Sequence, residues 1–229
     1  QAETRSEFQI LKKIVDCITE KSVSTSEEWV ETLMIYYNKE AGKLLKTHGI
    51  GILRSHTAPD QERLGRWSTI DPSLEMLAYS SATYCVPEAE TSHWGLGLSD
   101  YTHASSPLRR YADLYNQRCL IELLEGIHSK RAPEGLCYDL NLLGKSAKAF
   151  ERDMFFLKAL SSGPSSVEGK VLEIQEEKLK LQVWVPRWNR VVRVPLLSIA
   201  GIEVGQTLRL SYYVQYQNAR WKDKIIFSI

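Results

Sequence analysis

Apolar side chains recur every three or four residues over most of the first 160 positions, a period typical of helices that bury one face. Residues 7–20 show this spacing and predict a first helix. A second is expected after Ser24 or Ser26, either of which can act as N-cap ahead of an acidic first turn. It should end at Gly49, because glycine commonly terminates helices.

Further helices are predicted by the same period. Short ones should follow Pro59 and the Asp-Pro pair at 71–72, and long ones should span 107–127 and 138–160. The glycine-containing stretch 93–103 predicts a strand or a loop instead. The first 160 residues are therefore expected to be mainly helical.

A change of period marks the last third of the chain. "SSGPSS" at 161–166 is typical of a linker, and after it apolar residues alternate with polar ones in five short segments. Five short strands rich in Val, Ile, Tyr and Trp predict a small barrel of the OB type. The expected fold class is α+β, with domains at 1–162 and 163–229.

Composition adds little to this picture, but the distribution of charge does. With 43% hydrophobic and 10% aromatic residues, a chain of 229 residues can build a sizeable core. The net charge of +1 divides unevenly: from Pro164 onward ten Lys and Arg face six Asp and Glu. Affinity for a polyanion should therefore be local rather than general.

Several classes of protein are excluded on sequence grounds. No apolar run approaches the ~20 residues of a membrane span, and the start lacks the layout of a signal peptide. The four cysteines are scattered and the five histidines show no metal-ligand spacing, so no metal site is predicted in this chain. An intracellular protein is expected, cytoplasmic first, with the nucleus and organelles as alternatives.

The stretch "YTHASSPLRRYADL" carries the strongest chemical signal. Ser106 can cap a helix whose first position is Pro107, which places Arg109 and Arg110 in the first turn. Helix N-termini attract anions through free N–H groups, and guanidinium groups add bidentate donors. Together with the hydroxyls of three neighbours this pattern predicts a phosphate-binding site. The three hydroxyl residues are Thr102, Ser105 and Ser106.

A structural role is the alternative for these arginines. They can pair with Asp100 or Asp113 on a solvated face, which is the usual fate of adjacent arginines. The serines and the proline favour the phosphate site over that alternative.

Glu151 in "KAFERDMFF" is a second candidate. Its carboxylate can accept hydrogen bonds from ribose hydroxyls or orient Arg109. On spacing alone, an ion pair within its own helix is the better interpretation.

The barrel segment interleaves aromatic and cationic residues, as surfaces that bind single-stranded nucleic acid do. About half of the aromatics must be core, since alternate positions in strands face inward. Residues beside the basic loops are the better RNA-binding candidates. They are Arg187, Trp188, Arg190 and Trp221.

These motifs closely resemble the RNB family, the ribonuclease II and ribonuclease R exoribonucleases. "YTHASSPLRRYADLYNQR" is similar to the family signature Y-T-H-F-T-S-P-I-R-R-Y-A-D-x-x-x-H-R. "VETLMIYYNKEAG", "RSHTAPDQERL" and "AFERDM" resemble three further family segments, in family order. The strands after residue 163 resemble the family's C-terminal OB-fold RNA-binding domain, so the resemblance spans nearly the whole chain.

The resemblance implies a 3′-to-5′ exoribonuclease that hydrolyses single-stranded RNA to nucleoside monophosphates. Arg109 matches the arginine at the scissile or 3′-terminal phosphate, and Glu151 a carboxylate near the 3′-terminal nucleotide. Tyr101, Thr102, Ser106, Arg110 and Asp113 match positions that shape or support the pocket.

The family's Mg²⁺-binding aspartate cluster has no counterpart here, since Asp71 in "TIDPSLEML" stands without partner aspartates. We therefore expect Mg²⁺ to be held by residues outside this chain, which would be the C-terminal half of a longer catalytic domain. Its partners would be single-stranded RNA and the N-terminal half of that domain. Ala104, Ser105 and Gln117 depart from the signature, which keeps a catalytically inactive RNB-like binding or scaffolding module as the alternative.

Overall fold

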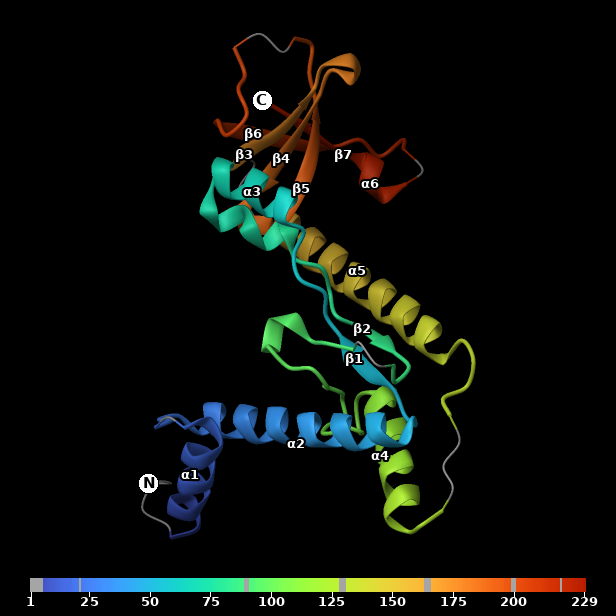
Figure 1. The fold of residues 1–229 in the computed structure, drawn as a ribbon. Helices are drawn as coiled ribbons and strands as arrows, with labels where there is room; N and C mark the ends of the chain where they lie inside the picture. Colours follow the sequence, from blue (N-terminus) through green and yellow to red (C-terminus); the bar gives the residue numbers. More distant parts are fainter. Residues whose placement is uncertain are drawn as a thin grey trace. The chain divides into compact units, whose positions relative to one another are not determined.

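A computed structural model describes residues 6–20, 22–88, 91–127, 131–162, 166–198, 201–218 and 220–229 (Figure 1). It divides into two compact units, and we describe each by itself. Unit 1 comprises residues 1–58 and 80–144, and unit 2 comprises 59–79 and 145–229. Among the described helices, none is both long and apolar enough to cross a membrane.

Unit 1 is built mainly of helices, as predicted. They are α1 (Ser6–Thr19), α2 (Ser26–His48), α4 (Tyr111–Leu124) and the first part of α5 (Leu136–Ser162). A two-stranded antiparallel sheet pairs β1 (Leu53–Ser55) with β2 (Thr83–Cys85). The segment predicted as strand or loop contains only the 3-10 turn η2 (Trp94–Leu96) and single bridges at His93.

The ends of α2 follow from local chemistry. Thr25, lying between the two predicted cap residues, forms the N-cap, and its side chain and Glu28 make a reciprocal capping box. Gly49 ends the helix in the left-handed conformation with φ 63°, as the sequence indicates. The inward face of α2 then packs on α4 and β1 in the core of unit 1. This core holds Ala41, Leu45, Ile50, Leu53, Ala104, Cys119 and Leu120.

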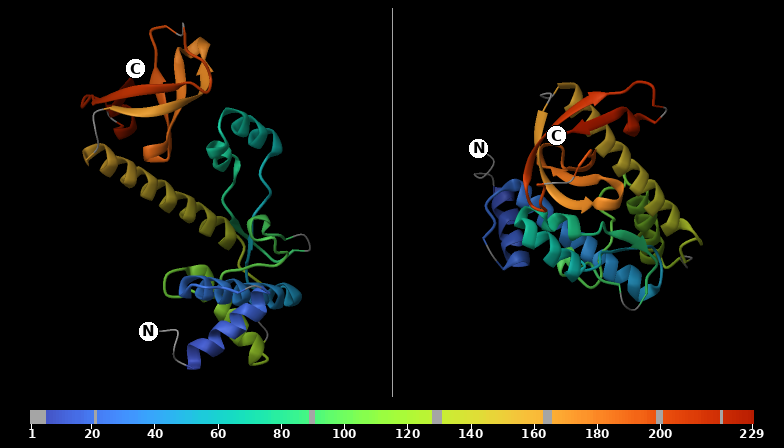
Figure 2. Two further views of the ribbon diagram at one scale, coloured as in Figure 1. Left: turned by 90° about the vertical axis from the view of Figure 1, so that its left-hand side faces the viewer. Right: turned by 90° about the horizontal axis from the view of Figure 1, so that it is seen from above.

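Unit 2 contains the predicted five-stranded barrel (Figure 2). Its strands are β3 (Ser166–Gln175), β4 (Lys180–Val185), β5 (Arg190–Pro195), β6 (Thr207–Val214) and β7 (Ile225–Ser228). The antiparallel order is β5-β4-β3-β6-β7, and β5 also contacts β7, so the sheet nearly closes. This is the strand order of an OB-fold barrel.

Shorter elements complete unit 2. The helix α3 (Gln61–Ile70) and the 3-10 helix η1 (Pro72–Ala78) form a hairpin, and the later part of α5 leads toward the barrel. The turns η3 (Glu176–Lys178) and η4 (Pro186–Trp188) join strands, and α6 (Trp221–Lys224) precedes β7.

Alternation along the strands decides which residues fill the barrel. Leu181, Val183 and Val185 of β4 point inward with Val192 and Val194 of β5. Gly169 of β3 packs tightly against β4: a Cβ there would lie 2.5 Å from Val183 Cγ1 and 3.0 Å from the Trp184 carbonyl oxygen. Only glycine fits this position without a shift of the neighbouring strand.

The α5 helix supplies part of the barrel core. Phe156 is 3% exposed and meets the Trp188 ring edge-on at 5.3 Å between centroids. Tyr212 of β6 donates a hydrogen bond to the Leu160 carbonyl at 3.0 Å. The end of α5 is therefore anchored to the strands that follow it.

The observed division differs from the predicted boundary after residue 162. The two units divide within α5, and residues 59–79 belong with the strands because their apolar side chains pack on the barrel. Residues 163–165 of the predicted linker lie outside the described part of the chain. The boundaries of the domains stay a prediction.

Candidate functional site

The helix predicted to begin at Pro107 begins four residues later. Pro107, Leu108 and Arg109 form a turn in which the N–H groups of Arg109 and Arg110 both donate to the Ser106 carbonyl. Arg110 occupies the N-cap position of α4. The predictions that Ser106 caps the helix and that both arginines lie in its first turn are therefore wrong.

Asp113 explains the later start. Its carboxylate is fully buried and accepts a hydrogen bond from the Ser106 N–H at 2.8 Å. It also accepts one from Arg110 Nη2 at 2.7 Å, and Arg110 Nε lies 2.7 Å from its second oxygen. One buried acid thus fixes the chain on both sides of the Pro107–Arg109 turn. Arg110 follows the structural alternative, whereas Asp100 pairs with Lys46.

Asn38 of α2 fixes the segment that leads into this turn. Its side chain is 1% exposed and accepts a hydrogen bond from the Ala104 N–H at 2.9 Å. Its amide nitrogen donates to the Tyr101 hydroxyl and to Ser105 Oγ, both at 3.2 Å. The buried amide therefore orients residues 101–105 from a different helix.

Thr102 and Tyr101, two of the predicted RNA-binding residues, are buried and support the loop, and their contact with RNA stays a prediction. Thr102 is fully buried, donates to the Ile52 carbonyl at 2.6 Å and accepts from Asn116 Nδ2 at 2.8 Å. Tyr101 is 7% exposed. The hydroxyl groups of both residues form hydrogen bonds within the network that holds the loop, because a buried polar group must find its partners inside the protein.

Arg109 is the cation that this network leaves available. It is exposed, and among the described residues we find no hydrogen-bond or ion-pair partner for its guanidinium. Its backbone is fixed by the turn, while its side chain faces solvent. The arrangement provides an exposed cation on a rigidly supported loop.

His103 lies inside the same network and stays neutral at physiological pH. The Tyr84 hydroxyl lies 2.8 Å from its Nδ1, and Arg54 stacks 4.4 Å from the centre of the Tyr84 ring. Burial, and then the charges of Arg110 and Arg54, lower the pKa of His103 to about 4. Burial also raises the pKa of Tyr84, which keeps the phenol protonated, so its O–H can donate to the imidazole.

Sequence reasoning missed most of these supporting residues. The signal for Asn38 was present, since it ends the "VETLMIYYN" motif. The roles of Asn116, Tyr84 and Arg54 depend on contacts between distant segments, which no spacing in the sequence reveals.

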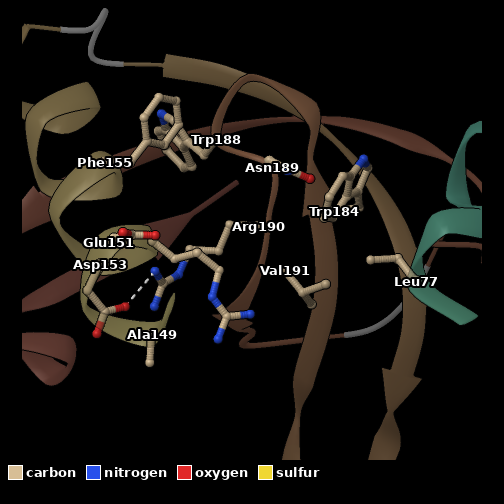
Figure 3. Close-up of a pocket in the computed structure, with 11 residues that line it drawn as sticks. Leu77, Ala149, Glu151, Asp153, Phe155, Trp184, Trp188, Asn189, Arg190 and Val191 are labelled. Carbon is tan, nitrogen blue, oxygen red and sulfur yellow. Dashed lines mark hydrogen bonds and ion pairs between the residues drawn. The ribbon is translucent and has the colours of Figure 1, made fainter. Parts of the chain in front are cut away.

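Unit 2 contains a separate candidate, a pocket of about 660 Å³ between α5, the β4–β5 hairpin and η1 (Figure 3). It gathers three of the predicted site residues, Glu151, Trp188 and Arg190. Arg190 Nη1 forms an ion pair with Asp153 at 2.9 Å, and its guanidinium covers the Phe156 ring at 4.5 Å. Glu151 is exposed at the rim and, among the described residues, forms no ion pair.

The remaining predicted RNA-binding residues of the barrel differ in how far their side chains are exposed. Trp188 is 3% exposed and packs with Phe156, Tyr212 and Phe227 in the barrel core, so little of its ring is accessible for base stacking, and its contact with RNA stays a prediction. Trp221 is half-buried against the same core. Arg187, at the tip of η4, is exposed and stays a candidate.

Arg109 belongs to unit 1 and Glu151 to unit 2, so a joint role for them stays a prediction. In the described ranges no group of three or more His, Cys, Asp or Glu side chains could hold a metal ion.

Comparisons with known proteins give this arrangement a context. Residues 68–126 match the RNB domain family. The chain is 29% identical over 201 residues to ribonuclease R from Helicobacter pylori, an alignment that covers 69% of the chain and 31% of that protein. The chain thus spans about a third of the length of this relative.

Solved structures share the fold. The ribonuclease R of Mycoplasma genitalium, solved with ribose-methylated single-stranded RNA, matches 89% of the chain and 41% of its own with TM-score 0.65 and 16% identity. An active-site mutant of the Dss1 exoribonuclease from Candida glabrata matches 99% of the chain and 35% of its own with TM-score 0.73 and 15% identity.

Proposed function

We propose that this chain, which resembles the RNB exoribonucleases in sequence and fold, is part of a 3′-to-5′ exoribonuclease that hydrolyses single-stranded RNA to nucleoside monophosphates. The curated relative is named a ribonuclease, and one structural neighbour was solved with single-stranded RNA. This chain would form the C-terminal half of the catalytic domain, and the N-terminal half would complete it.

A single observation carries this proposal. Of two adjacent arginines, Arg110 is held by the buried Asp113, while Arg109 stays exposed on a turn that Asp113 of α4 fixes and that follows a segment held by Asn38 of α2. Arg110 supports the loop through its buried partner, whereas among the described residues the Arg109 guanidinium has none. An exposed guanidinium on a rigid support suits an anion that approaches from outside, such as an RNA phosphate.

Arg109 would stabilise the negative charge that builds up on the reacting phosphate in the transition state. Mg²⁺, bound by residues outside this chain, would supply Lewis-acid chemistry. The neutral His103 would leave Arg109 as the cation that receives the phosphate. Glu151 would accept hydrogen bonds from ribose hydroxyls near the 3′ end.

The proposal is tested by adding the chain to a 5′-labelled single-stranded RNA with Mg²⁺, with and without the N-terminal half of the domain supplied in trans. We expect shortening from the 3′ end only when that half is present. RNA binding without shortening in both cases would favour the alternative, a catalytically inactive RNB-like binding module.

The role of Arg109 needs a matched control. Arg118 is an exposed arginine of α4, the helix that follows the Arg109 turn, so Arg118→Ala removes the same charge from a nearby part of unit 1. In the reconstituted enzyme we expect Arg109→Ala to lower turnover about a hundredfold or more, with a smaller loss of RNA affinity, and Arg118→Ala to change neither. Equal losses in affinity and turnover would contradict a transition-state role.

A further inference from the structure

The outer face of strands β4 and β5 is the part of the barrel where OB folds bind oligonucleotides, because these are the second and third strands of the barrel. Trp184 of β4 lies opposite Val191 of β5 in the antiparallel register. Their neighbours Val183 and Val192 fill the barrel core, so Trp184 and Val191 belong to the outer face.

The α3–η1 hairpin covers part of this outer face. Trp184, 6% exposed, forms a second apolar cluster with Leu74 of η1 and Leu172 of β3. An ion pair between Lys170 of β3 and Asp71 at the start of η1 adds a polar attachment. A long run of nucleotides therefore cannot lie along the face in the way that is usual for an OB fold.

The pocket of about 660 Å³ lies at the edge of this covered face. Its apolar wall includes Trp184, Val191 and Leu77, and α5 forms the facing side of the pocket (Figure 3). Pockets of roughly 300–1,000 Å³ accommodate small organic ligands. The opening therefore has room for one nucleotide but not for an extended chain.

Three polar side chains at the pocket are available to a ligand. Among the described residues, the side chains of Glu151, Arg152 and Asn189 have no hydrogen-bond or ion-pair partner. Arg190, by contrast, is occupied by Asp153 and Phe156. The pocket thus combines an apolar wall with one available cation, one available carboxylate and one available amide.

We propose that this pocket binds a single nucleotide unit of RNA, an inference that rests on the proposed function. The base packs on the half-buried Leu77 and Val191, and the Asn189 amide bonds its polar edge. The Arg152 guanidinium binds the phosphate, because guanidinium donors match phosphate oxygens. The barrel therefore holds one unit of the chain, where OB folds commonly contact about 4 to 16 nucleotides.

The test measures the affinity of adenosine 5′-monophosphate for the 229-residue chain by isothermal titration calorimetry. Arg152→Ala should weaken binding about tenfold or more through loss of the phosphate contact. Lys148→Ala removes the same charge from an exposed position of α5 outside the pocket lining and should leave the affinity unchanged.

A second variant blocks the pocket without changing charge. Ala149 lines the pocket from α5, so Ala149→Phe should also weaken binding about tenfold while the thermal unfolding of unit 2 stays unchanged. Binding that neither variant alters, inorganic phosphate competing as well as the nucleotide, or no nucleotide binding to the folded chain would each overturn the proposal.

The failure of the pocket and the failure of the proposed function give different results. If a single-stranded oligonucleotide binds through Arg109 but the nucleotide does not bind, the pocket proposal fails and the proposed function stands. If the nucleotide binds at the pocket while reconstitution gives no RNA shortening, the exonuclease proposal fails instead.

Discussion

Replacement of Asp113 by alanine should be among the most destabilising single changes in unit 1. The substitution removes the acceptor for the Ser106 N–H at 2.8 Å and for Arg110 Nη2 at 2.7 Å. It also leaves the Arg110 guanidinium, which is 24% exposed, without its counter-charge. The loss thus combines a hydrogen bond to the backbone with a broken ion pair.

The magnitude follows from these contacts. Removing one partner of a buried ion pair costs about 3–5 kcal/mol, because the other charge stays desolvated. Since Arg110 keeps some contact with water, we expect the lower end, about 3 kcal/mol, for Asp113→Ala. Arg109→Ala should change the free energy of unfolding by less than about 0.5 kcal/mol, because its side chain is exposed.

Urea unfolding at pH 7, monitored by circular dichroism, measures both values. A double-mutant cycle with Arg110→Ala should give a coupling energy of about 1–3 kcal/mol, since the two groups interact directly. The reasoning is refuted if Asp113→Ala costs less than about 1 kcal/mol, or if the Asp113 and Arg110 effects are additive.

Three further predictions concern other parts of the structure. Burial and nearby arginines lower the pKa of His103 to about 4. The contribution of neutral His103 to the free energy of unfolding is therefore complete above pH 6.5 and is lost as the pH falls toward 4. The change in unfolding free energy over this pH range amounts to roughly 3 kcal/mol. His103→Gln should therefore flatten the pH dependence of urea unfolding. Parallel stability profiles of the variant and the unmodified protein would exclude His103 as the cause. Gly51→Ala should lower thermal stability by about 1–3 kcal/mol more than Gly49→Ala, because both have positive φ but only the new Cβ at Gly51 meets other atoms at 2.8 Å. Equal melting temperatures of these two variants would contradict that clash. Trp188→Ala should lower the free energy of unfolding in urea by about 3–5 kcal/mol, because it opens a cavity in the barrel core. An unchanged free energy of unfolding would contradict the burial of Trp188 in that core.

The helices of unit 1 and the strands of unit 2 could be predicted because their signals are local. The end of α2 follows from Gly49, and its start from a cluster of residues able to cap. The alternation of Leu181, Val183 and Val185 gives both the strand and its inward face. Each of these features depends on side chains a few positions apart.

The candidate site was predictable only in part. The motif identified Arg109 and Arg110, but spacing could not show that Asp113 would occupy one and leave the other exposed. The helix α4 begins at Tyr111 and not at the predicted Pro107 for the same reason, since the buried Asp113 carboxylate accepts the hydrogen bond from the Ser106 N–H. Competition between such partners is decided by burial.

The sequence by itself thus determined the periodic elements, the order of helices before strands, and the resemblance to RNB proteins. Tertiary structure decided which polar groups are used internally and which remain available. Asn38 reaches Ala104 across 66 positions, and the pocket gathers residues from η1, α5, β4 and β5. The physical reason is that a buried polar group requires a partner inside the fold, and only folding brings distant segments close enough to provide one.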